Sequence, residues 1–332
     1  MSEKIENLLG EDRTFDPPSS IVENANATQE WFDLANEDRL AYWQKQALER
    51  ITWYKEPKEI LDDSDAPFYK WFKDGELNLA YNCLDRHLET DADRIAFYWE
   101  GEPGDSQEIT YQDLYERVCK LSNGLKELGV KKGDRIAIYL GMTPEIVISM
   151  LACARIGAVH SVVFGGFSAE ALADRINDAE AKVVITADGA WRRGDIVPLK
   201  QNVDDSLKLT DHIESVIVVK RTENEVTMVD GRDYWYSELV DKQEADCEPE
   251  VMNAEDMLYI LYTSGTTAKP KGIVHTQAGY LTGVTTTHSA VFDVKEDDIY
   301  WCAADCGWVT GHSYIVYGPL ANKTTSVMYE GA

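Results

Sequence analysis

The chain has 332 residues, of which 44% are hydrophobic, enough to bury a large core and to form two domain-sized units. Its 59 acidic residues outnumber its 32 basic residues and give a formal net charge of -27. Such a charge repels phosphate backbones, so the composition argues against nucleic acids and anionic membranes as partners.

The first part of the chain, residues 1–85, differs from the rest because aromatic side chains are frequent and strands do not alternate with helices. Large apolar side chains need a surface to pack on, so we expect an N-terminal extension that lies across the main domain. A small helical domain is the alternative. Towards the end of this part, apolar residues at helical spacing predict a helix over residues 78–88.

From residue 109 strands and helices alternate. Residues 110–129 predict a helix with Thr110 as its N-cap, Asp113 three residues later and Gly129 after its last apolar position. The elements expected next are a strand over 134–140, a helix over 143–157, a strand over 159–164, a helix over 169–177 capped by Ser168, and strands over 182–186 and 215–220. This alternation predicts βαβ units and a mostly parallel sheet, with ligands at the carboxyl ends of its strands.

An acidic and polar stretch over residues 222–249 interrupts this pattern, so we divide the α/β part into a first subdomain over 86–249 and a second over 250–332. The elements expected in the second are a strand over 257–262, a helix over 276–291, a strand over 299–304, a turn over 305–307, a helix from Ser313 and a strand over 324–329. The chain ends directly after that strand, at Ala332, and we therefore expect a fragment.

The segment over residues 257–276 is expected to form a strand, a small-residue loop and the start of a helix. Backbone N–H groups and hydroxyls of such a loop converge on an anion, and lysines add positive charge. The candidate ATP phosphate-binding residues are Thr263, Ser264, Gly265, Thr266, Thr267, Ala268, Lys269 and Lys271. The loop is not of the Walker type, because six residues separate Gly265 from Gly272 and Ile273 follows. On composition alone, a polar surface turn is the alternative.

The sequence of this loop, TSGTTAKPKG, closely resembles the phosphate-loop signature of the adenylate-forming ligases, which include acyl-CoA synthetases, luciferases and peptide-synthetase adenylation domains. One position departs, since the family usually has glycine where this chain has Ala268. With the segments YNCLDRH, VVFGGFSAEALADRI and ADCGWVTGHSYIVYGPL, the resemblance narrows to the acetyl-coenzyme A synthetases and spans nearly the whole chain. It implies two doubly wound α/β subdomains of a large N-terminal domain, incomplete here and preceded by an extension.

The resemblance also implies an activity: ATP-dependent activation of acetate, or another short-chain carboxylate, to an acyl-adenylate, followed by transfer to coenzyme A with release of AMP and pyrophosphate. The expected ligands are ATP, Mg²⁺, acetate and coenzyme A. An in-line attack between two anions requires a clamped triphosphate whose charge is shared by magnesium and fixed donors. The catalytic residues are expected beyond Ala332, so we expect the isolated chain to be a partial enzyme. A non-catalytic nucleotide-binding homologue is the alternative.

Further site residues follow from the same resemblance. The positions that match the acyl pocket are Trp308, Val309 and Thr310, and those that match the coenzyme A site are Phe164, Gly165, Gly166, Arg192, Arg193 and Thr310. Asp195 stands where another arginine is usual, which puts that part of the coenzyme A site in doubt. The alternatives are a core role for Trp308 and Val309 and a solvated basic turn for the two arginines.

Two expectations concern the surroundings of the protein. No apolar run reaches the length of a transmembrane helix and the first residues lack the apolar centre of a signal peptide, so we expect a cytoplasmic location. The six cysteines form no C-x-x-C pair, and we interpret them as buried thiols. A metal site at Cys302, Cys306 and His312 is disfavoured by the apolar residues around it, and no metal site is predicted.

Overall fold

The computed structural model describes residues 14–263 and 270–331. The N-terminal part contains α2 (Ser19–Asn24), α3 (Gln29–Glu37), α4 (Arg39–Arg50), β1 (Leu61–Asp62), β2 (Lys70–Trp71), β3 (Glu76–Leu77), α5 (Leu79–Cys83) and α6 (Asp85–Asp91). The central part contains β4 (Ile95–Glu100), β5 (Ser106–Thr110), α7 (Tyr111–Glu127), β6 (Arg135–Tyr139), α8 (Pro144–Arg155), β7 (Val159–Val162), α9 (Ala169–Ala179), β8 (Val183–Ala187), β9 (Ala190–Arg192), β10 (Asp195–Val197), α10 (Leu199–Ser206), β11 (Ser215–Val219), β12 (Asp233–Trp235) and α11 (Tyr236–Val240).

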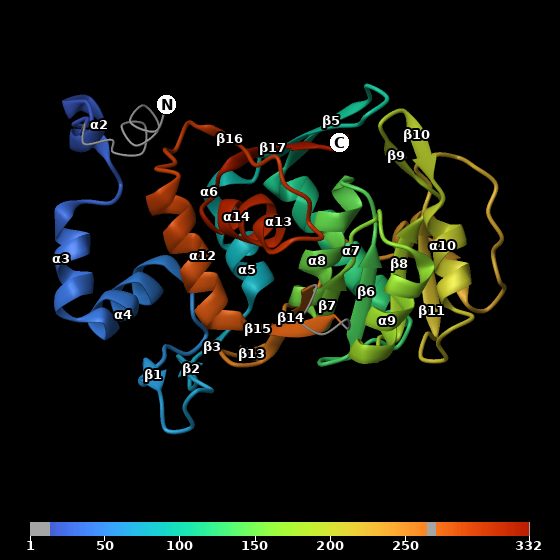
Figure 1. The fold of residues 1–332 in the computed structure, drawn as a ribbon, viewed down its shortest axis with the longest axis horizontal. Coiled ribbons are helices and arrows are strands. Elements are labelled where there is room, and N and C mark those ends of the chain that lie inside the picture. Colours follow the sequence, from blue (N-terminus) through green and yellow to red (C-terminus); the bar gives the residue numbers. More distant parts are fainter. Residues whose placement is uncertain (1–13, 264–269, 332) are drawn as a thin grey trace, which may run out of the picture.

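The last part contains β13 (Met252–Asn253), β14 (Met257–Thr263), β15 (Lys271–Thr276), α12 (Gln277–Val291), β16 (Ile299–Trp301), α13 (Val309–Gly311), a π-helical segment (His312–Tyr317), α14 (Gly318–Ala321) and β17 (Thr325–Tyr329). Figure 1 shows these elements as two neighbouring bodies of strands and helices, with α2 to α4 along one flank beside α12.

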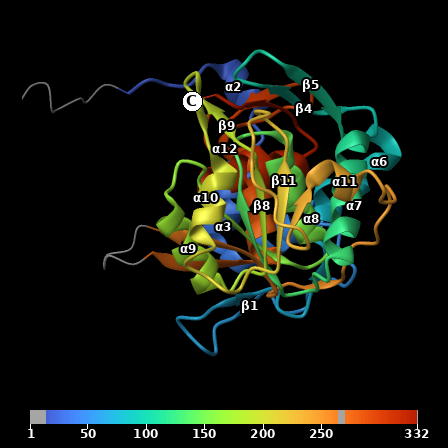
Figure 2. The same cartoon turned by 90° about the vertical axis from the view of Figure 1, so that its right-hand side faces the viewer.

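Within the described residues, a seven-stranded sheet has the strand order β12-β11-β8-β6-β7-β14-β15, and we call it the large sheet. Its strands pair in parallel from β12 to β14. Every residue of β7, β8 and β11 is buried, because helices cover both faces of the sheet. Figure 2 shows α9 and α10 on one side of these strands and α7, α8 and α11 on the other. The predicted α/β class with a mostly parallel sheet is confirmed.

The local signals for α7 are also confirmed. The Thr110 hydroxyl accepts a hydrogen bond from the Asp113 N–H, and the Asp113 carboxylate accepts from the Thr110 N–H, so a full capping box starts the helix. Its buried side includes Leu114, Val118 and Leu125, which recur at helical spacing. The local sequence therefore fixes where α7 begins and which of its sides is buried against α8 and α11.

A four-stranded sheet, the small sheet, joins residues that are far apart in sequence. Its order is β16-β17-β4-β5 over the described residues, with β17 parallel to both β16 and β4. Strand β14 lies in the large sheet beside β7, whereas β4 pairs with β17 of the last part. The division into residues 1–85, 86–249 and 250–332 remains a prediction, and the sheets themselves are shared across residue 250.

Two elements differ from the sequence prediction. Residues 271–276 do not enter a helix directly but form β15, which returns antiparallel to β14 before α12 begins at Gln277. The β-branched pair Ile273 and Val274 favours this strand, which also covers the otherwise open edge of β14. The helix expected over 78–88 is divided into α5 and α6 at Leu84, where φ is -126° and ψ is -73°.

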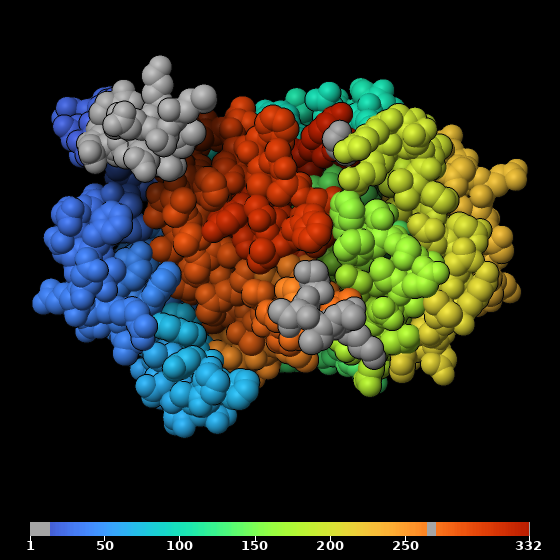
Figure 3. Space-filling view, viewed as in Figure 1, coloured from blue at the N-terminus to red at the C-terminus, as the bar shows by residue number. Residues whose placement is uncertain are grey.

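Helix α4 packs against α12 through the buried Ala47, and the segment after α2 is attached to the end of α12 by polar contacts. The Asn26 side chain donates to the carbonyls of Ser289 and Val294, and the Asn26 N–H donates to the Asp293 carboxylate at 2.7 Å. Helices α2 and α3 bury no residue, and Figure 3 shows the N-terminal part as a separate mass against α12. The expectation that aromatic side chains of this part pack on a surface is met by Phe72, which is 1% exposed, but not by Phe68, which is 71% exposed.

Arg155 is a buried cation at the end of α8. Its guanidinium donates to both carboxylate oxygens of Asp85 at 2.8 Å, its Nε donates to the Cys247 carbonyl, and it lies 5.0 Å from the centre of the Tyr115 ring. The side chain is 1% exposed. It therefore connects α8, α6 and the linker before β13.

We expect Arg155→Met to lower the free energy of unfolding by about 3–5 kcal/mol, because Asp85, which is only 15% exposed, would be left without its partner. Lys242→Met provides the matched control, since its pair with Glu127 is about half exposed and is expected to contribute less than about 1 kcal/mol. Urea unfolding of the three proteins measures both effects. Equal losses for the two variants would contradict the buried pair as a major contributor.

The state of the cysteines and the presence of membrane-spanning helices can be checked in the structure. All six cysteines are free thiols, buried except for the half-buried Cys302. Among the helices of residues 14–263 and 270–331, none combines the length and apolar character needed to cross a membrane.

Candidate active site

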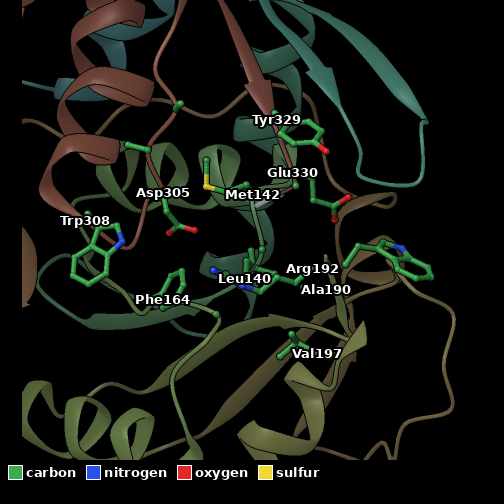
Figure 4. A pocket seen from close by; sticks show the side chains of 16 residues that line it. Leu140, Met142, Phe164, Ala190, Arg192, Val197, Asp305, Trp308, Tyr329 and Glu330 are labelled. Atoms are coloured by element: carbon green, nitrogen blue, oxygen red, sulfur yellow. The ribbon is translucent and has the colours of Figure 1, made fainter. Parts of the chain in front are cut away.

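A cavity of about 380 Å³ lies at the carboxyl ends of β6 and β7. Leu140 and Met142 follow β6, Phe164 and Gly165 follow β7, and the segments around residues 303–308 and 329–331 close the cavity from the side of the small sheet. Figure 4 shows the side chains of this lining. The position agrees with the expectation that ligands of an α/β sheet bind where its strands end.

The predicted site residues divide into three groups. Phe164, Gly165, Arg192 and Trp308 line the cavity together. Four other predicted residues are described but do not line it: Gly166, Arg193, Val309 and Thr310, all exposed. Of the phosphate-binding candidates, Thr263 and Lys271 pair across the hairpin β14–β15, and the remainder, Ser264, Gly265, Thr266, Thr267, Ala268 and Lys269, lie outside the described residues.

Aromatic rings form one wall of the cavity. The Phe164 ring lies 5.9 Å from the Trp308 ring and 5.6 Å from the Phe167 ring, in tilted and edge-to-face arrangements that aromatic pairs favour. Trp308 remains 50% exposed, so its indole is available to a ligand. The interpretation of Trp308 as plain core is therefore not supported by its exposure.

Arg192 is held over this wall. Its guanidinium carbon lies 4.8 Å from the centre of the Phe164 ring, a cation–π geometry. Among the described residues Arg192 makes no ion pair, so its guanidinium can still pair with an anionic ligand, although its charge acts on the nearby Asp305. It occupies the last position of β9, whose hairpin with β10 turns at Arg193 and Gly194 with φ of 54° and 82°. This turn directs Arg193 to solvent.

A charge network fixes the rim of the cavity. The Glu330 carboxylate, 0% exposed, pairs with the Arg221 guanidinium, which also donates to Asp105 at 2.9 Å. The Glu102 N–H donates to Glu330 at 3.1 Å, and the Glu102 carboxylate accepts from the Gly194 N–H in the β9–β10 turn. The hairpin that carries Arg192 is thereby tied to the end of β17.

The turn over residues 305–311 is packed too tightly for side chains at its two glycines. A Cβ at Gly307 would lie 2.9 Å from the Phe164 Cα, and a Cβ at Gly311 would lie 2.2 Å from the Asp305 carbonyl oxygen. Within the turn, the Trp308 N–H donates to that same carbonyl at 3.0 Å. The two glycines thus allow Asp305 and Trp308 to face the cavity from one short segment.

Asp305 was not predicted as a site residue. It lines the cavity, and its Oδ1 accepts a hydrogen bond from the Gly307 N–H at 2.7 Å. Burial raises the pKa of its carboxyl, and the Gly307 hydrogen bond and the Arg192 charge only partly oppose this. The sequence could have indicated Asp305 by its position a few residues after a predicted strand, because a carboxylate there often faces the ligand of an α/β fold.

Behind Trp308 lies a buried group of histidine and tyrosine rings. The His312 Nδ1 and the Trp308 carbonyl are 3.0 Å apart, the His312 and His160 rings stack at 5.8 Å, and the His160 Nε2 and the Tyr317 hydroxyl are 2.9 Å apart. Both histidines are 0% exposed, and burial lowers the pKa of each. Neutral imidazoles therefore support the turn that carries Trp308.

The chain is similar to known proteins over its whole described length. Residues 84–332 match the family model described as AMP-binding enzyme, and residues 17–83 match the model described as acetyl-coenzyme A synthetase N-terminus. An acetyl-coenzyme A synthetase of Streptomyces avermitilis is 59% identical over 332 residues, which cover 99% of this chain and 51% of that protein. The acetyl-coenzyme A synthetase of Pasteurella multocida is 55% identical over 98% of this chain and 51% of that protein. The one of Mycolicibacterium smegmatis is 54% identical over 96% of this chain and 34% of that protein. The chain thus spans about half the length, or less, of these relatives.

Proposed function

The chain belongs to the family of AMP-binding enzymes, and from this membership we propose that it takes part in activating acetate, or another short-chain carboxylate, with ATP and transferring the acyl group to coenzyme A. The products would be acetyl-CoA, AMP and pyrophosphate. The observation that carries this proposal is the cavity at the ends of β6 and β7. There, a residue matched to an acyl pocket, Trp308, meets residues matched to a coenzyme A site, Phe164, Gly165 and Arg192.

In the proposed first step a carboxylate oxygen attacks the α-phosphorus of ATP, and the bond to pyrophosphate breaks. The candidate donors at the end of β14, of which Thr263 and Lys271 are described, would hold the triphosphate. Mg²⁺ prefers oxygen ligands and keeps several waters, so it would arrive on the ATP phosphates and reduce their negative charge. Among the described residues, no group of three or more His, Cys, Asp or Glu side chains could hold the ion by itself, so phosphate oxygens and water would complete its coordination.

In the second step the thiol of coenzyme A takes the acyl group. A chain with a net charge of -27 must attract the anionic coenzyme through locally placed cations. Arg192, which is free of ion pairs among the described residues and lines the cavity, is the side chain best placed to do so. Free thiols at all six cysteines support a reducing, cytoplasmic location for the reaction.

The proposal is tested by acetate-dependent exchange of pyrophosphate into ATP, with protein expressed from its whole reading frame. We expect exchange with acetate, weaker exchange with propionate and little with longer acids, because one methylene changes binding by only about 1–3 kcal/mol. ATP binding without any carboxylate-dependent exchange would instead favour the non-catalytic nucleotide-binding alternative.

We expect Arg192→Ala to raise the KM for coenzyme A by about 10-fold to 100-fold, which is the usual loss when a charged hydrogen bond of about 1.5–3 kcal/mol is removed. Acetate-dependent exchange should change little, because that step precedes coenzyme A. Arg193→Ala is the matched control, since Arg193 is exposed in the neighbouring turn and should have a smaller effect. If exchange falls as far as coenzyme A use, the role of Arg192 is structural.

A further inference from the structure

Asp305 shares a cavity with both groups of proposed ligand contacts. It follows β16 by a few residues and precedes Trp308, and it shares the cavity with Phe164 and Arg192. Figure 4 shows its carboxylate directed into the cavity, beside Trp308 and Phe164. The Gly307 N–H holds Oδ1 at 2.7 Å, and the Asp305 carbonyl is packed against Gly311. The carboxylate is therefore fixed by the turn that carries it.

The second carboxylate oxygen is available. Among the described residues, Asp305 Oδ2 has no hydrogen-bond partner and the side chain makes no ion pair. The other carboxylate of the cavity, Glu330, is in contrast engaged by Arg221 and by the Glu102 N–H. Of these two carboxylates, Asp305 is thus the one that can accept a proton or a hydrogen bond from a ligand.

The groups around Asp305 set its basicity. Arg192 on β9 is the nearby cation, and the carboxylate of Glu330 after β17 is balanced by Arg221. The adjacent Cys306 thiol is fully buried, and burial raises its pKa well above the ordinary value, so it stays neutral. Burial outweighs the Arg192 charge and raises the pKa of Asp305, which makes the carboxylate a stronger base than an exposed aspartate.

We propose that Asp305 is the residue that accepts the proton of the coenzyme A thiol during acyl transfer, an inference that rests on the proposed function. A thiol with a pKa of about 8.5 is mostly protonated at neutral pH, whereas the thiolate is the nucleophile. As the S–H bond breaks, the proton passes to Oδ2 and the sulfur bonds to the acyl carbonyl carbon. The bond from that carbon to the AMP phosphate oxygen then breaks, and AMP leaves with the electron pair.

The geometry suits this role better than a purely structural one. The turn already satisfies Oδ1, so the fold does not need Oδ2. Trp308, on the same turn, is matched to the acyl pocket, and Phe164 across the cavity is matched to the coenzyme A site. A base that lines the same cavity as these two side chains lies where an acyl group and a thiol would meet.

The test compares Asp305→Asn with Asp297→Asn, an exposed neighbour as control, in protein expressed from its whole reading frame. We expect Asp305→Asn to keep acetate-dependent exchange and the KM for coenzyme A within about threefold, while kcat for thioester formation at pH 7 falls about 10²-fold to 10⁴-fold. The variant's kcat should then rise with pH towards 9, as the thiol ionises without help.

Three results for Asp305→Asn would overturn the proposal. A raised KM for coenzyme A with kcat retained would assign Asp305 to binding. A pH profile like that of the unsubstituted protein, or equal loss of exchange and thioester formation in a folded variant, would also contradict it. If Asp305→Asn does not fold by circular dichroism, Asp305→Glu keeps a base at a displaced position. The Asp305→Glu variant should then have a reduced kcat for thioester formation, with the same dependence of kcat on pH as the unsubstituted protein. A kcat that rises with pH as a free thiol ionises would contradict the role. Absence of exchange in the unsubstituted protein would instead reject the proposed function.

Discussion

Replacement of Gly311 by alanine is expected to reduce acetate-dependent exchange at least about 100-fold, because it displaces the turn that carries Asp305 and Trp308. The new Cβ would lie 2.2 Å from the Asp305 carbonyl oxygen and 2.6 Å from the Cys306 Cα. These are backbone atoms, so they cannot rotate away as a side chain does. Such overpacking costs about 1–3 kcal/mol or more, and relief requires the turn to move.

Gly283→Ala is the matched control, since Gly283 also lies in a helix, α12, and a Cβ there meets no atom within 4 Å. This variant should be as stable as the parent or about 1 kcal/mol more stable, because alanine favours helices. Exchange assays and thermal unfolding compare the two. A Gly311→Ala protein with parental exchange would show that the turn adapts and that its exact path is not needed.

The stability of the fold is expected to fall by several kcal/mol between pH 7 and pH 5, because its buried histidines, His87, His160, His288 and His312, all have lowered pKa values. Burial lowers the pKa of His87, His288 and His312 from 6.5 to about 4. The unfolded chain therefore takes up protons near pH 6.5 while the folded chain does not, so stability is complete above that pH and declines as the pH falls towards 4. At pH 5 each histidine destabilises the fold by about 2 kcal/mol.

Urea unfolding at pH 7, 6 and 5 measures this effect with little contribution from carboxylates, which titrate near pH 4 in the unfolded chain. His288→Gln should remove about 2 kcal/mol of the loss at pH 5, because its imidazole is 0% exposed and no longer titrates on unfolding. Equal unfolding free energies at pH 7 and pH 5 would be inconsistent with neutral buried imidazoles.

Elements with complete local signals could be predicted from the sequence. Helix α7 shows this, since Thr110 and Asp113 mark its start and one apolar stripe marks its buried side. Strand β15 could not be predicted in this way. Its six residues are rich in β-branched side chains and follow a polar loop, but this pattern does not indicate that they pair antiparallel with β14. The Arg155–Asp85 pair shows the same limit for tertiary contacts, since nothing local in either segment identifies the partner.

The candidate site could be predicted in part. Phe164, Gly165, Arg192 and Trp308, selected by resemblance, line one cavity although they come from three separate segments. Arg193 does not, because the β9–β10 turn reverses the chain there and sends its side chain outward. Whether an adjacent residue faces a ligand depends on backbone direction, which motif matching does not provide.

The small sheet has a consequence for the order of events during synthesis. Strand β4 pairs with β17, roughly 230 residues later, and β5 covers its other edge. At about 5–20 residues per second, a ribosome needs about 10–50 seconds to make that stretch. Until then one edge of β4 has unpaired backbone groups, and such an edge can pair with other chains. The β4–β5 hairpin is therefore the segment of the nascent chain for which a ribosome-associated chaperone would matter most.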